Sequence, residues 1–329
     1  MNVFSKRVKQ WIFLAIKIII AIAIVRYLVS GIDWKAFEAG LRSYSPAMIA
    51  AGAVLIVWND AVQAVRWSYL SRYQCSWMAS VEAIIIGGFI NVILPAKLGE
   101  VSRVIYLRNF YNYPINRGVG VIVLERGADL FVVALMVLLS AWLVADSQMM
   151  KDLSVLVIVV MIGAIYLLKN GNGHFIKWGA SKIPVRVIRV YGLKIIRVIQ
   201  RELENERIVI VVLYTIFLRG TYFLTMVFFL TQIGGFVLEW KALFIIYLVG
   251  SLAMAVPLLP GGTGTFHAGI VMAAGWYGIS KESAFAIAVL YHLLLNMVPI
   301  LLSLVILFSK NISVSGMVKL TTKREGESG

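Results

Sequence analysis

The sequence predicts an all-α polytopic membrane protein with about six full transmembrane helices plus two oppositely oriented re-entrant helical hairpins in an inverted repeat. Hydrophobic residues make up 60% of the 329 positions, charged residues only 14%, and the mean hydropathy is +0.87. A soluble domain carries nearer a quarter charged residues. Several apolar runs reach the roughly 20 residues that a helix needs to cross a bilayer. One pattern of residues, described below, occurs twice along the chain.

We expect one integral membrane domain over residues 1–329. Its parts are an N-terminal span (1–45), repeat 1 (46–145), an extra span with a basic amphipathic interfacial helix (146–206), repeat 2 (207–309) and a cytoplasmic tail (310–329). Basic residues precede the first apolar run and follow the last one, so the positive-inside rule predicts cytoplasmic N- and C-termini. The expected location is the cytoplasmic membrane of a bacterium or an archaeon. Residues after about Ser309 are expected to be disordered.

Repeat 1 begins with a span predicted at about Pro46 to Trp67. Asn59, Gln63 and Arg66 recur on one face of this helix, and Asp60 lies close to that face. A polar stripe of this kind faces a bundle interior and not lipid. It serves either hydrogen bonding between helices or the lining of a substrate path, and the sequence leaves both open.

The next apolar segment, about Val81 to Leu94, is too short to cross roughly 30 Å of hydrocarbon as a helix. Basic residues flank it on both sides, which places both flanks in the cytoplasm. The segment is therefore predicted to be a re-entrant hairpin with its tip near residues 91–99, where Pro95 breaks the helix.

Three ionisable residues lie inside the following span, predicted at about Asn116 to Ala145: Glu125, Arg126 and Asp129. Each charge at the centre of a membrane helix costs roughly 2.5–3.5 kcal/mol, so this helix needs polar partners. The cluster either neutralises itself and fixes packing, or binds a charged group. Arg219, near the middle of a span at about 208–230, is expected to meet Asp60, Glu125, Asp129 or a bound anion.

Between the repeats, a further span is predicted at about 153–168, followed by a basic connector at residues 169–207. Basic and apolar residues fall on different faces of its helix, from Lys182 to Arg201, which is typical of a helix at the membrane interface. Its expected partner is anionic lipid headgroup. A purely topogenic role is the alternative, and nucleic acid is not expected.

The pattern that occurs twice joins a helix break to a basic residue further along. Leu94-Pro95 precedes Val123-Leu124-Glu125-Arg126 in the first copy, and Leu259-Pro260 precedes Val289-Leu290-Tyr291-His292 in the second. Charges place the second hairpin, about Ala242 to Gly278, so that it enters from the outer face. Oppositely oriented repeats with broken helices are typical of transporters. The glycines at the second break either permit a tight bend or present backbone N–H groups to an anion.

A family resemblance rests on four segments. They are Pro95-Ala-Lys-Leu-Gly-Glu100 with Arg103, Leu124-Glu-Arg-Gly-Ala-Asp129, Pro260-Gly-Gly-Thr-Gly264-Thr-Phe266 and Leu290-Tyr-His-Leu-Leu294. These resemble the flippase-like membrane domain of lysylphosphatidylglycerol synthases and their stand-alone relatives, over nearly the whole chain. The resemblance implies re-entrant helices and movement of anionic or modified lipids between leaflets. The aminoacyl-transferase domain of the synthases is missing from this sequence, so lipid aminoacylation is not expected.

The sequence departs from the family at two positions. His267 stands where the family usually has an acid, and His292 stands where it often has arginine. A histidine titrates near pH 6.5, so protonation here would gate or couple transport; hydrogen-bonded core histidines are the alternative. No metal or cofactor is expected, because two histidines without nearby carboxylates or thiols are too few ligands.

The first functional hypothesis is therefore a lipid translocase or scramblase that binds the headgroup of an anionic or modified phospholipid, glycolipid or polyprenyl phosphate between the hairpins. The predicted substrate-binding residues are Arg103, Arg126, Arg219, Glu100, Glu125, Asp129, Asp60, Gly261, Gly262, Gly264, His267, His292 and Asn296. No residue is predicted to be catalytic and the protein is not expected to be an enzyme. The alternatives are a membrane-embedded enzyme with Glu125 or Asp129 as base, and a non-catalytic partner of a soluble envelope-lipid or glycosyl transferase.

Overall fold

A computed structural model gives the architecture. It describes residues 19, 22–24, 26, 28–72, 74–94, 98–144, 148–149, 151–152, 154–159, 163, 207–256 and 260–322. The chain forms two compact units, and four of the described helices have residues in both. Unit 1 comprises residues 1–61, 81–106 and 221–329, and unit 2 comprises residues 62–80 and 107–220.

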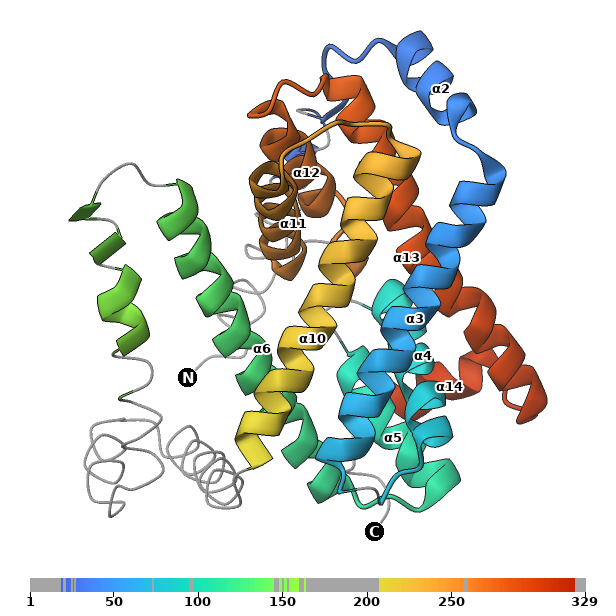
Figure 1. The fold of residues 1–329 in the computed structure, drawn as a ribbon. Helices are drawn as coiled ribbons and strands as arrows, with labels where there is room; N and C mark the ends of the chain where they lie inside the picture. The colour runs from blue at the N-terminus through green and yellow to red at the C-terminus, as the bar shows by residue number, and fades with distance from the viewer. Residues whose placement is uncertain are drawn as a thin grey trace, which may run out of the picture. The chain divides into compact units, whose positions relative to one another are not determined.

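The described residues form helices and loops, with no strand among them (Figure 1). Within this described part, three helices are long and apolar enough to cross a membrane: residues 46–70, 208–233 and 281–309. They correspond to α3 (Pro46–Leu70), to α10 (Arg207–Phe228) with its π-helical continuation η1 (Phe229–Ile233), and to α13 (Lys281–Ser309). The predicted spans at 46–67, 208–230 and 283–308 thus agree with the structure, as does 116–145 with α6 (Ile115–Val144). The described residues therefore agree with the predicted all-helical class, and their long apolar helices are consistent with a membrane protein.

The first predicted hairpin has the expected helix–break–helix form. Its helices are α4 (Trp77–Ile93) and α5 (Gly99–Tyr111). At Gly87 the two helices approach so closely that a Cβ there would lie 2.7 Å from Arg103 Cγ. The amide of Asn91 closes the break, because its Oδ1 accepts a hydrogen bond from Gly99 N at 2.8 Å. α4 is about 25 Å long at 1.5 Å per residue, which is less than the hydrocarbon thickness.

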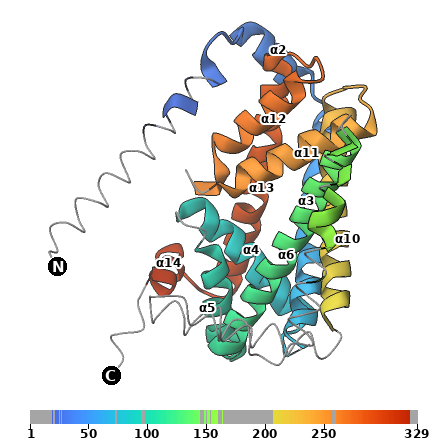
Figure 2. The same ribbon diagram turned by 90° about the vertical axis from the view of Figure 1, so that its left-hand side faces the viewer.

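The second predicted hairpin has the same form. α11 (Trp240–Ala255) is followed by the short helix η2 (Pro260–Gly262) and by α12 (Thr265–Gly275). α11 and α12 lie side by side in both views (Figures 1 and 2), and Gly250 of α11 permits this, since a Cβ there would lie 2.5 Å from Ile270 Cδ1. Gly261 has φ +65°, a conformation that glycine adopts without strain. The re-entrant course of both segments, and their opposite orientation, stay predictions.

Within unit 1, α13 contacts both broken segments. Ser303 Oγ donates a hydrogen bond to the Ile85 carbonyl of α4 at 3.1 Å, and Pro299 packs against Gly88 one turn further along α4. Pro299 lies inside the helix and has no N–H to bond to the preceding turn. Near its start α13 packs on α2 (Trp34–Ser43), whose Phe37 ring lies 5.4 Å from that of Phe285.

The predicted disorder after Ser309 is wrong for part of that region. Residues Val314–Thr322 form the helix α14. Its Met317 side chain is fully buried, which indicates that an apolar face was overlooked among the basic residues. The predicted helix from Lys182 to Arg201 lies outside the described residues. Most of the predicted spans at 11–29 and 153–168 also lie outside them.

Candidate functional site

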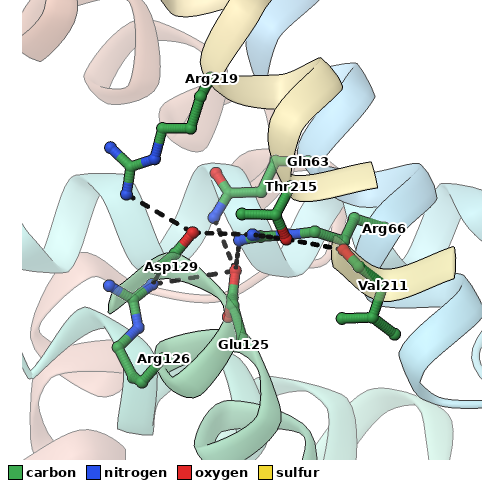
Figure 3. Close-up of polar contacts among 8 residues, drawn as sticks. All are labelled: Gln63, Arg66, Glu125, Arg126, Asp129, Val211, Thr215 and Arg219. Atoms are coloured by element: carbon green, nitrogen blue, oxygen red, sulfur yellow. Dashed lines mark hydrogen bonds and ion pairs between the residues drawn. The ribbon is translucent and has the colours of Figure 1, made fainter. Parts of the chain in front are cut away.

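Three helix segments of unit 2 carry polar stripes that meet one another. Gln63 and Arg66 lie on α3. Glu125 and Asp129 are four residues apart on α6, and Thr215 and Arg219 are four residues apart on α10. A spacing of four residues places side chains on one helix face, so each helix turns a polar stripe toward the others. Figure 3 shows these side chains converging.

Arg66 is the centre of this group. Its Nη2 lies 2.6 Å from Glu125 Oε1, and its Nη1 lies 2.8 Å from Asp129 Oδ1. Nη1 also donates to Thr215 Oγ1 at 3.1 Å, and that hydroxyl in turn donates to the Val211 carbonyl at 2.8 Å. One guanidinium therefore ties together three helices. Because its planar fork presents donors in fixed directions, arginine serves this purpose better than lysine.

Two further arginines reach the same carboxylates from outside. Arg126 Nη2 lies 3.2 Å from Asp129 Oδ2 and 3.9 Å from Glu125 Oε1. Arg219 Nη2 lies 3.5 Å from Asp129 Oδ1. Asp129 thus contacts three guanidinium groups, as the dashed lines in Figure 3 show. We name these five charged residues the arginine–carboxylate cluster: Arg66, Glu125, Arg126, Asp129 and Arg219.

Exposure divides the cluster into an inner and an outer part. The side chains of Arg66 and Glu125 are each 1% exposed and that of Asp129 is 9% exposed, whereas Arg219 is 21% and Arg126 41% exposed. Charges enclosed in a low-dielectric interior interact strongly and are retained only when paired. The inner residues therefore hold the helices together. The outer arginines combine a carboxylate contact with access from outside the protein.

The sequence prediction named four of the five cluster residues as site residues and omitted Arg66. It also omitted Gln63, whose Nε2 donates to Glu125 Oε1 at 3.1 Å, and Thr215. The stripe of Asn59, Gln63 and Arg66 was the signal that could have identified Arg66 and Gln63, but it does not include Thr215. The predicted partner of Arg219 is confirmed, because Asp129 was one of the expected acids.

Three predicted site residues belong to unit 1 instead. Asp60 lies on α3, and Glu100 and Arg103 lie on α5. Arg103 is buried, and its positive charge acts on the Asp60 carboxylate. Asn59, beside Asp60, donates from Nδ2 to Thr225 Oγ1 at 2.9 Å and so ties α3 to α10 within this unit.

The remaining predicted residues come together at the second helix break, also in unit 1. The buried rings of His267 and His292 lie 4.8 Å apart between centroids. His292 Nε2 lies 2.8 Å from the Gly261 carbonyl, which can only accept, so this nitrogen carries the hydrogen. Asn296 Nδ2 donates to the His292 carbonyl at 2.8 Å. His267 Nδ1 accepts from Gly264 N at 3.3 Å and caps the start of α12.

His267 and His292 therefore both make hydrogen bonds to the backbone of this break. The predicted ligands Gly262 and Gly264 lie in the same turn, with φ +75° and +84°. Thr265 Oγ1 donates to the Gly262 carbonyl at 3.1 Å, which further fixes the turn. Among the described residues, no group of His, Cys, Asp and Glu has the arrangement of a metal site.

Comparison with known families decides the relationship that the motifs indicated. The family described as the lysylphosphatidylglycerol synthase TM region matches residues 14–303. The chain belongs to this family. The match includes both helix breaks and every residue of the arginine–carboxylate cluster. Membership of the lysylphosphatidylglycerol synthase TM region family, together with the apolar helices, establishes an integral membrane protein.

One relative with a curated description comes from an archaeon. It is a UPF0104 membrane protein of Methanocaldococcus jannaschii, 25% identical over 224 residues, which cover 63% of this chain and 87% of the relative. Its description gives no activity. The comparison therefore supports a membrane protein of the lysylphosphatidylglycerol synthase TM region family.

Proposed function

We propose that this protein is a membrane lipid translocase that binds the anionic headgroup of a phospholipid, glycolipid or polyprenyl phosphate. One observation carries the proposal: Arg126 and Arg219 are partly exposed and both contact the enclosed Asp129. Arginine within a membrane is costly and marks a pathway for charged groups. A phosphate offers the same kind of acceptor oxygens that Asp129 offers, so the two arginines suit a headgroup.

The contacts of the carboxylates favour transport over catalysis. Glu125 accepts from Arg66 and Gln63, and Asp129 contacts three arginines. A general base needs a free lone pair aimed at its substrate. Arginines contact both oxygens of Asp129 and Oε1 of Glu125, which suits these carboxylates to orienting the guanidinium groups. The proposal therefore includes no catalytic step and no cofactor.

The proposed setting is the cytoplasmic membrane of a bacterium or an archaeon, with both termini in the cytoplasm. The distribution of lysine and arginine supports this orientation. Anionic lipid headgroups are the proposed partners of the basic helix at Lys182 to Arg201, and a soluble transferase is a further proposed partner. The two hairpins, both in unit 1, are proposed to re-enter the membrane from opposite faces.

The test is headgroup accessibility in vesicles that contain the purified protein. A fluorescent phosphatidylglycerol is placed in both leaflets, and the fraction bleached by an external reductant is followed with time. Arg126→Ala and Arg219→Ala are each expected to slow translocation about tenfold, which corresponds to the loss of one charged hydrogen bond. Arg42→Ala is the matched control, because Arg42 forms an exposed ion pair with Glu38 on α2.

Two results would overturn the proposal. If both variants translocate lipid at the wild-type rate, Arg126 and Arg219 are not part of the transport path. Appearance of a chemically altered lipid during the assay, detected by mass spectrometry, would instead favour the membrane-embedded enzyme.

A further inference from the structure

The arginine–carboxylate cluster is not electrically neutral. It contains three guanidinium groups and two carboxylates, which leaves one positive charge. The three inner residues alone, Arg66, Glu125 and Asp129, carry one negative charge. The two positive charges of Arg126 and Arg219 therefore exceed the one negative charge of the inner residues.

The outer arginines bond to different oxygens of the same carboxylate. Arg126 contacts Asp129 Oδ2, and Arg219 contacts Oδ1, which Arg66 also engages at a shorter distance. The Arg66 contacts of 2.6 and 2.8 Å hold the inner part without help from outside. An anion can therefore replace Asp129 as the partner of Arg126 and Arg219, while Arg66 keeps the carboxylates of Glu125 and Asp129 in place.

We propose that this site is selective for a headgroup with a single negative charge, a phosphodiester, over the doubly charged phosphomonoester. The inference rests on the proposed translocase function. In a medium of low dielectric constant an assembly with no net charge is favoured. One negative charge neutralises the cluster, whereas a dianion leaves it with a net negative charge inside the membrane.

A change in the net charge of the cluster is expected to change which headgroup it prefers. Glu125→Gln removes one negative charge and keeps an amide oxygen at the position that accepts from Arg66 and Gln63. The cluster then carries two positive charges and suits a dianion. Glu38→Gln is the matched control, since it removes a carboxylate from an exposed ion pair on α2.

The experiment compares two fluorescent lipids in zwitterionic vesicles at pH 8. Phosphatidylglycerol is a phosphodiester, and phosphatidic acid is a phosphomonoester, largely doubly charged at that pH because a phosphomonoester loses its second proton near pH 6. The wild type is expected to move phosphatidylglycerol about tenfold faster than phosphatidic acid. Glu125→Gln is expected to lower this ratio below one, and Glu38→Gln to leave it unchanged. A ratio near one in the wild type and in Glu125→Gln would overturn the charge selectivity while the translocase function stands.

A binding measurement separates the two proposals. The thermal unfolding temperature of the purified protein in detergent is recorded with each lipid and with glycerophosphoglycerol, which has the phosphodiester and no acyl chains. Stabilisation by phosphatidylglycerol over phosphatidic acid, reversed in Glu125→Gln, would support the selectivity even if neither lipid is translocated. Equal shifts with both lipids would overturn it. If glycerophosphoglycerol stabilises the protein and neither lipid does, the site binds a soluble phosphodiester. The claim that its ligand is a membrane lipid is then overturned. If Glu125→Gln fails to fold, Asp129→Asn provides the same change of charge.

Discussion

Arg66 Nη2 and Glu125 Oε1 lie 2.6 Å apart with both side chains 1% exposed, and this pair joins α3 to α6. Few ion pairs are so fully enclosed. An enclosed pair adds little stability compared with apolar residues of the same size, yet loss of one partner leaves an uncompensated charge. The pair is therefore the position in unit 2 where a single substitution is expected to have its largest effect.

Arg66→Met is expected to lower the free energy of unfolding by about 3–5 kcal/mol, because it removes the guanidinium that lies 2.6 Å from the enclosed Glu125 carboxylate. The measurement is reversible unfolding by sodium dodecyl sulfate in mixed micelles. Adding Glu125→Gln to Arg66→Met removes that carboxylate charge and is expected to restore part of the loss. Arg42→Met, in an exposed pair, is expected to cost less than about 1 kcal/mol. Equal losses in the two single variants would contradict the enclosed ion pair.

Gly261→Ala is expected to destabilise the second helix break for two reasons. Its φ of +65° costs a residue with a Cβ about 1–2 kcal/mol, and that Cβ would lie 3.2 Å from Asn296 Oδ1. Gly235→Ala is the matched control, since Gly235 has φ +68° and open space around it. The difference in unfolding free energy between the two variants isolates the contact with Asn296. This difference is expected to disappear when Asn296→Ala is added to Gly261→Ala, and its persistence would contradict the contact with Asn296.

Gly250→Ala is expected to force α11 and α12 apart, at a cost of about 1–3 kcal/mol. The new Cβ would lie 2.5 Å from Ile270 Cδ1. Ile270→Val removes that methyl group, so the double variant is expected to recover most of the loss in the same unfolding assay. Gly220→Ala in α10, where no atom lies within 4 Å of the added Cβ, is expected to be neutral or slightly stabilising. Failure of Ile270→Val to rescue would show that the helices pack differently at this crossing.

Cys75 offers a probe of the loop between α3 and α4. It is the one cysteine of the chain, its side chain is buried, and burial raises the pKa of its thiol, partly offset by the hydroxyl of Ser80. Because the thiolate is the reactive form, a raised pKa moves alkylation of the native protein to higher pH. Iodoacetamide labelling of the native protein is expected to reach half its maximal rate at a higher pH than labelling of the unfolded chain. Coincident pH profiles would contradict a buried thiol.

The sequence was sufficient to predict helices whose apolar runs are long, such as α3, α10 and α13, because bilayer thickness sets their length. It also predicted both helix breaks, where Pro95 and Pro260 interrupt apolar segments. The apolar face of α14 was missed, since Met317 and its neighbours stand among basic and small polar residues that resemble a disordered tail.

The composition of the cluster could be predicted only in part. Charges within α6 and α10 had to find partners, and this requirement alone linked Arg219 to Asp129. The central place of Arg66 could not be predicted, because it depends on which face of α3 meets α6 and α10. Rings such as Tyr69 and Tyr214, 5.3 Å apart, fix that face, and their pairing joins residues far apart in the chain.

The two hydrogen bonds that α13 makes to the broken segments restrict how these segments can move. His292 holds the Gly261 carbonyl, and Ser303 of the same helix holds the Ile85 carbonyl. Neither segment can shift independently while both bonds persist. Their motions are mechanically coupled through α13. A displacement of one segment must therefore either displace the other segment as well or break the hydrogen bond at His292 or at Ser303.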